Sequence, residues 1–80
     1  MNMTTKDTLK EVRIVATRNG LTFKVDNRRY INGKPAYRFI DKETKETVLS
    51  NMNLSMALNN VCSGFIDSYN PANKSFDGVG

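Results

Sequence analysis

Side chains able to do covalent or acid–base chemistry are few in this 80-residue sequence. It has no histidine, the residue most often used in general acid–base catalysis. The closest carboxylates, Asp41, Glu43 and Glu46, lie in a lysine-containing stretch that is typical of a solvated turn. The single cysteine, Cys62, has no adjacent base to activate its thiol, and we expect it to be a small buried residue. The sequence predicts a protein that is not an enzyme and needs no metal or cofactor.

Cationic residues are concentrated in the middle of the chain. Six of them lie between Arg18 and Arg38 beside one carboxylate, Asp26, whereas the whole chain has 12 Lys and Arg against 8 Asp and Glu. Cations neutralise phosphates, and exposed aromatic rings stack on bases. We therefore predict a binding module that engages nucleic acid or an acidic protein surface, with an ordinary solvated face as the alternative. The residues expected to bind are Lys24, Arg28, Arg29, Tyr30, Lys34 and Arg38.

A second candidate surface lies at the start of the second predicted helix. Asn51, Met52 and Met56 are grouped there with other amide and hydroxyl side chains. Helix N-termini attract anions, and exposed methionines adapt to varied partners. The alternative interpretation is that these residues cap the helix and fill gaps in the core.

The elements that must position these residues are short. Residues 5–19 fit either a helix that ends at Asn19-Gly20 or a strand that turns there, because the stretch 12–15 is rich in β-branched residues. We favour the helix, since Thr4 or Thr5 provides an N-cap and Leu9 and Val12 share one face. The stretches 21–26, 36–41 and 47–49 alternate or pair as antiparallel strands, with a second Asn-Gly turn at residues 32–33.

The final helix is predicted from Asn53 to Ser63, because Leu54, Leu58 and Val61 recur on one face and Gly64 follows. The fold class is therefore a small α+β domain of order α-β-β-β-α. We predict one compact domain over residues 4–67 and a loosely ordered polar tail over residues 68–80.

Composition also limits the location and partners. A lone cysteine excludes an internal disulfide, and the sequence has neither a recognisable signal peptide nor an apolar run long enough to cross a membrane. We expect a soluble cytoplasmic protein without a membrane partner. A short sheet has open edges, so a homodimer is a further hypothesis.

Two resemblances extend this interpretation. Three strands followed by a helix over residues 21–66, with basic residues on the strands, resemble the sheet-based DNA-binding domains of some plant-type proteins and phage integrases. The sequence departs from that pattern in lacking tryptophan and in its acidic stretch Asp41–Glu46. The short, Asn-rich chain is also similar to small bacteriophage accessory proteins, which implies an alternative function as an inhibitor that binds and blocks a host protein.

Overall fold

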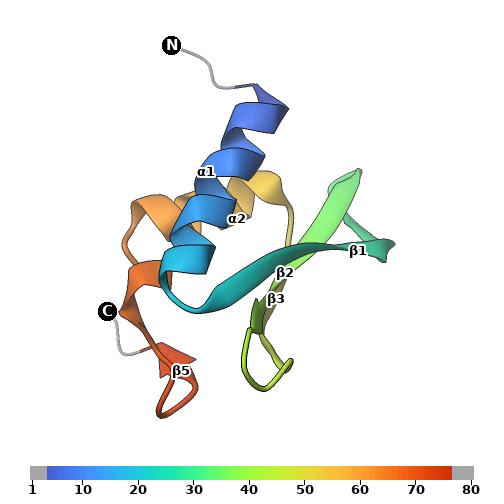
Figure 1. Cartoon of the computed structure of the whole chain (residues 1–80). Helices are drawn as coiled ribbons and strands as arrows, with labels where there is room; N and C mark the ends of the chain where they lie inside the picture. Colours follow the sequence, from blue (N-terminus) through green and yellow to red (C-terminus); the bar gives the residue numbers. More distant parts are fainter. Residues whose placement is uncertain (1–3, 77–80) are drawn as a thin grey trace.

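The computed structural model describes residues 4–76 and contains two helices that pack on a small sheet (Figure 1). The predicted α+β class and its helix–strand–strand–strand–helix order are confirmed. The elements in chain order are α1 (Thr5–Arg18), β1 (Leu21–Ile31), β2 (Lys34–Asp41), β3 (Thr47–Met52), α2 (Leu54–Cys62), the 3-10 turn η1 (Ile66–Ser68), β4 (Tyr69–Asn70) and β5 (Ser75–Phe76).

Residues 5–18 are helical, as favoured over the strand alternative. The Thr4 side chain accepts a hydrogen bond from the backbone N–H of Asp7 at 3.1 Å and so caps α1. The β-branched residues that argued for a strand include Val12 and Val15, and both are buried against the rest of the protein. Tertiary burial therefore overrides their weak helix propensity.

β1, β2 and β3 form an antiparallel sheet in that order, so β2 is the central strand. Asn32 and Gly33 both have positive φ, +55° and +77°, which is the backbone of the type I′ turn expected from this dipeptide. Phe23 lies opposite Phe39, and the register shifts between Asp26 and Tyr30. Residues 27–29 therefore form a bulge, and β1 continues beyond the predicted strand to Ile31.

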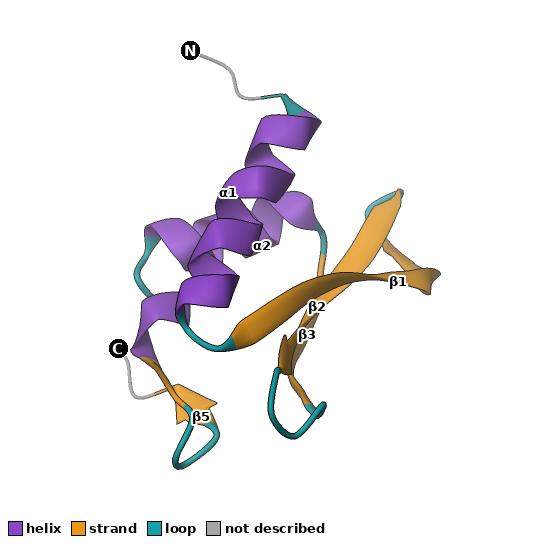
Figure 2. Ribbon diagram, viewed as in Figure 1, coloured by secondary structure: helices purple, strands orange, loops and turns teal. Residues whose placement is uncertain are grey.

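Both helices cover the same face of the sheet (Figure 2). The Phe23 ring stacks on Tyr37 with centroids 4.7 Å apart, and Phe39 is completely buried. No helix among the described residues is long and apolar enough to cross a membrane. The buried core residues are Val12, Val15, Ala16, Leu21, Phe23, Phe39, Met52, Ala57, Ile66 and Tyr69.

α2 has the predicted cap and stop. The Asn53 side chain accepts a hydrogen bond from the Met56 N–H at 3.0 Å, and Gly64 has a φ of +83° just after the helix. Ala57 is the residue of α2 in deepest contact with the core. The expectation that Cys62 is buried is wrong, because Cys62 lies off the stripe that includes Ala57 and is exposed.

The segment after α2 folds back on the domain. Residues 69–70 pair with residues 75–76, and the Phe76 ring stacks on Phe65 with centroids 4.5 Å apart. Tyr69 is buried, and its hydroxyl donates to Asp41 Oδ2 at 2.6 Å. Residues 68–76 of the predicted tail thus contain regular structure and one core residue, while residues 77–80 lie outside the described part. The predicted domain boundary at residue 67 stays a prediction.

Candidate nucleic-acid interface

The face of the sheet opposite the helices carries cations of β1 and β2. Because side chains alternate along a strand, Phe23, Phe39 and Met52 face the helices, while Lys24 and Arg38 face the other way. Lys24 and Arg38 lie directly opposite each other in the β1–β2 register. Neither forms an ion pair with a residue of the described part of the chain. We call this side of the sheet the open face.

Arg29 joins the same face from the bulge in β1. Its Nη1 donates to Asn51 Oδ1 on β3 at 2.8 Å, and its Nε lies 3.9 Å from Asp26 Oδ2. β2 lies between β1 and β3, so the Arg29–Asn51 hydrogen bond spans the central strand. Ala36 of β2 is only 1% exposed, although it faces away from the helices. The Arg29 side chain therefore adds a third cation to the open face.

One side-chain nitrogen on this face lacks a hydrogen-bond partner. Arg38 Nε is buried and has no hydrogen-bond partner, the only such side-chain nitrogen or oxygen atom found among residues 4–76. A buried donor without a partner is destabilising, and so are like charges placed directly opposite across two strands. The open face thus retains two features that reduce the stability of the protein.

The structure brings together only part of the predicted basic site. Lys24, Arg29 and Arg38 share the open face, whereas Lys34 lines a cavity of about 480 Å³ on the helix side, with Tyr37 and other residues. Arg28 and Tyr30 lie toward the far end of the β1–β2 hairpin (Figure 1). Both are exposed, Tyr30 to 68%.

The second candidate surface is divided by the structure. Asn51 is exposed and, through Arg29, belongs to the open face. Met52 is only 2% exposed, so its assignment to a binding surface is corrected: it pairs with Tyr37 on the helix side and fills the core. Met56 is 41% exposed on α2. Asn51 thus extends the first candidate site and does not define a separate one.

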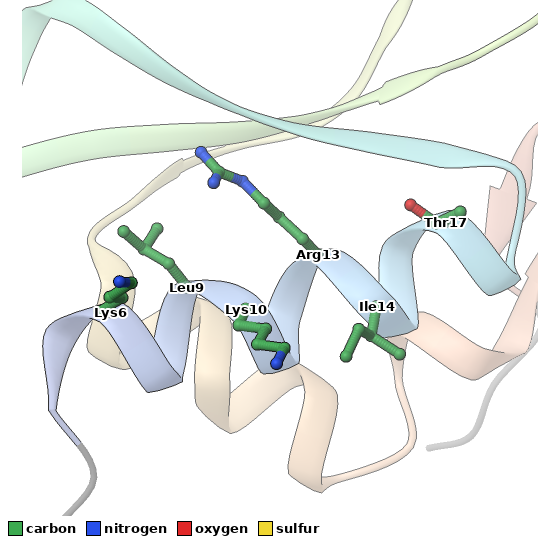
Figure 3. Close-up of a pocket in the computed structure, with 6 residues that line it drawn as sticks. All are labelled: Lys6, Leu9, Lys10, Arg13, Ile14 and Thr17. Atoms are coloured by element: carbon green, nitrogen blue, oxygen red, sulfur yellow. The ribbon is translucent and has the colours of Figure 1, made fainter.

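Sequence reasoning missed a second group of cations, on α1. Lys6, Lys10 and Arg13 recur at i, i+4 and i+7, the spacing that puts side chains on one side of a helix. They line a surface groove of about 520 Å³ together with apolar residues (Figure 3). The i, i+4, i+7 spacing that predicted α2 from its apolar residues is also present in these cations of α1 and would have found them.

The titratable groups with shifted pKa values lie away from the open face. Hydrogen bonds from the Tyr69 hydroxyl and from two backbone N–H groups lower the pKa of Asp41. Hydrogen bonds from Asn19 and Arg18 lower the pKa of Asp67. Burial and the hydrogen bond to Asp41 raise the pKa of Tyr69 to about 12. Through these hydrogen bonds, Tyr69 connects the segment after α2 to the sheet, and Asp67 connects it to α1. Their role is structural.

No group of three or more potential metal-ligating His, Cys, Asp or Glu side chains occurs within residues 4–76. The chemistry available on the open face is therefore that of its cations, which offer N–H donors and positive charge to an anion. Comparison of the chain with known proteins found no matching family model, no similar curated protein and no similar solved structure.

Proposed function

We propose that this protein is a non-enzymatic nucleic-acid-binding module that binds the phosphate backbone with the open face of its sheet. The observation that carries the proposal is the arrangement of Lys24, Arg38 and Arg29, three cations on a sheet face that no helix of the described chain covers. One carboxylate, Asp26, is close to Arg29 and offsets only part of their charge.

The details of these three side chains suit a phosphate ligand. Arg38 lies opposite Lys24 on this face, and guanidinium groups bind phosphate oxygens through paired N–H groups. The hydrogen bond to Asn51 holds Arg29 in place before binding, which lowers the entropy cost of fixing its side chain. The exposed Tyr30 ring and Arg28 toward the end of the hairpin extend the surface along a bound strand, where an aromatic ring can stack on a base.

Titration at two salt concentrations tests the proposal. A fluorescently labelled 20-nucleotide DNA, as a single strand and as a duplex, is titrated with the protein at 50 and 200 mM KCl. Three phosphate contacts predict a loss of affinity of about 40-fold for the duplex and about 20-fold for the single strand over this range. Absence of binding at 50 mM KCl, or an affinity that does not depend on salt, would contradict the proposal.

A matched pair of variants locates the site. Lys24→Gln with Arg38→Gln should weaken binding at 50 mM KCl by at least about 10-fold, since two charge-assisted contacts are lost. Lys42→Gln with Lys45→Gln removes the same charge from the exposed turn between β2 and β3 and should change affinity less than about twofold. Equal losses in both variants would show that only net charge matters and would overturn the assignment to the open face.

The same titration separates nucleic acid from an acidic protein surface. Poly-L-glutamate carries carboxylates on a peptide backbone and serves as the probe for the second class. If it binds through Lys24 and Arg38 while neither DNA does, the nucleic-acid proposal is wrong and a protein-blocking function replaces it.

A further inference from the structure

Two Asn-Gly dipeptides of the chain lie in different surroundings. Asn-Gly is the sequence most prone to spontaneous deamidation, because glycine has no side chain to obstruct attack of its backbone nitrogen on the preceding side-chain amide. Asn19-Gly20 follows α1, and Asn32-Gly33 forms the turn between β1 and β2. The same reactive sequence therefore occurs in two environments.

The first dipeptide is held by hydrogen bonds at both reacting groups. Asn19 Nδ2, the atom that leaves in a deamidation, donates to the Val15 carbonyl and to Asp67 Oδ1, each at 2.9 Å. The backbone nitrogen of Gly20, which would be the nucleophile, donates to the Thr17 carbonyl at 3.2 Å. Asn19 is also half-buried. Cyclisation at this site requires these hydrogen bonds to break, which slows it.

The second dipeptide has none of these restraints. Asn32 and Gly33 are both exposed. Neither the Asn32 side chain nor the Gly33 backbone nitrogen forms a hydrogen bond with another residue of the described chain. The amide that reacts and the nitrogen that attacks it are therefore both accessible to water and to each other.

The end of the β1–β2 hairpin is weakly held, so the turn can open locally. Two residue pairs, Tyr30–Pro35 and Ile31–Lys34, separate the turn from the bulge at residues 27–29. Pro35 has no backbone N–H to donate to the ladder, and none of the residues in these pairs is buried. Elements with few buried contacts open at a small cost in free energy. Opening lets the turn dipeptide reach the geometry needed for cyclisation.

We infer that Asn32 is a site of spontaneous deamidation in the folded protein and that Asn19 is protected from it. The Gly33 backbone nitrogen, after losing its proton to hydroxide, attacks Asn32 Cγ. The side-chain nitrogen takes a proton from water and leaves as ammonia, which closes a succinimide ring. Water then opens the ring at either carbonyl and leaves aspartate or isoaspartate. Each event removes one unit from the net charge of +4, at the end of the hairpin that carries Arg28 and Tyr30.

Peptide mapping of the intact chain measures the two sites separately. The protein is kept at pH 8 and 37 °C for several weeks, and trypsin at pH 6 then releases residues 19–24 and residues 30–38 as different peptides. The peptide of residues 30–38 should convert to its aspartyl and isoaspartyl forms at least about 10-fold faster than the peptide of residues 19–24. Equal rates, or faster conversion at Asn19, would overturn the inference.

Unfolded protein is the control for effects of the flanking sequence. In 6 M guanidinium chloride both dipeptides lose their surroundings, so their rates should agree within about threefold. Folding should then slow Asn19 at least about 10-fold more than it slows Asn32. If the difference between the sites persists in the denaturant, or if folding slows both sites equally, the structural explanation is wrong.

A matched pair of variants tests the cause of the protection. Asp67→Ala removes one acceptor of the Asn19 side-chain amide and should speed deamidation of Asn19 at least about threefold, with no change at Asn32. Glu43→Ala removes a carboxylate from the exposed turn between β2 and β3 and should change neither rate. Circular dichroism spectra check that both variants remain folded. An unchanged rate at Asn19 in Asp67→Ala would contradict protection by this hydrogen bond.

Discussion

The helix-covered face of the sheet and its open face differ in whether their polar side chains have partners. On the covered side, Asp41 is only 3% exposed, and its two carboxylate oxygens accept hydrogen bonds from Tyr69 and from the backbone of residues 43 and 44. On the open side, Arg38 Nε has no partner, and Lys24 lies opposite Arg38. The buried carboxylate of the covered side is thus hydrogen-bonded, whereas the open side has two cations opposite each other. The two faces therefore differ in how completely their polar groups are paired.

The largest effect should come from the centre of the covered face. Phe39→Ala removes a fully buried ring that packs against Phe23. We expect the free energy of unfolding to fall by about 3–5 kcal/mol, which is most of the stability of a domain of this size. Urea unfolding followed by circular dichroism measures it. A loss below about 1 kcal/mol would contradict the description of this face as the core.

Tyr69→Phe tests the polar part of the covered face. The substitution keeps the ring but leaves Asp41 Oδ2 without its hydrogen-bond donor, so we expect a loss of about 1–3 kcal/mol. Tyr30→Phe is the matched control, because this ring is 68% exposed and its loss should be close to zero. Equal effects of the two substitutions would show that the Tyr69–Asp41 contact adds nothing.

The same contact predicts two pH dependences. The pKa of Tyr69 is raised to about 12, so its contribution is complete below the unfolded value of 10.0 and is lost as the pH rises toward 12. The pKa of Asp41 is lowered, so its contribution is complete above its ordinary value of 3.8 and is lost as the pH falls below it. Urea midpoints should therefore fall more steeply between pH 9.5 and 11 in the wild type than in Tyr69→Phe. Identical slopes would contradict the first dependence.

The smallest change in stability, and one of opposite sign, is expected on the open face. Lys24→Glu converts the like-charge pair with Arg38 into an opposite-charge pair, which should raise the free energy of unfolding by about 0.2–1 kcal/mol. The same substitution should weaken DNA binding. Lys42→Glu, in the turn, is the control for net charge. A lower free energy of unfolding in Lys24→Glu would contradict the description of Lys24 and Arg38 as an unfavourable pair.

Local patterns predicted most of the fold. The recurrence of Leu54, Leu58 and Val61, with Asn53 before them and Gly64 after them, defines α2 from neighbouring residues alone. The Asn32-Gly33 turn set the β1–β2 hairpin in the same way. The alternation of Lys24 with its apolar neighbours was also sufficient to place it on the outside of the sheet.

Contacts between distant residues were beyond such reasoning. The Arg29–Asn51 hydrogen bond depends on the bulge at residues 27–29, which no local pattern announces. The hydroxyl of the buried Tyr69 pairs with Asp41, 28 residues earlier in the chain. The residues around Tyr69 are polar and rich in turn formers, and this local pattern suggested a loose tail. Met52 was predicted to lie on the surface. It is buried because it pairs with Tyr37 across β2 and β3, and no local sequence pattern predicts this pairing.

The contact between Tyr69 and Asp41 also has a consequence for the order of folding. The β1–β2 hairpin closes over a two-residue turn, whereas the ion pair of Arg18 with Asp67 closes a loop of 49 residues. Loop-closure entropy makes short-range pairings form early and long-range ones late. The strands that carry Lys24 and Arg38 would then assemble before the last segment docks. The Tyr69–Asp41 contact joins residues 28 positions apart, so we expect it to form late, and Tyr69→Phe should speed unfolding more than it slows folding.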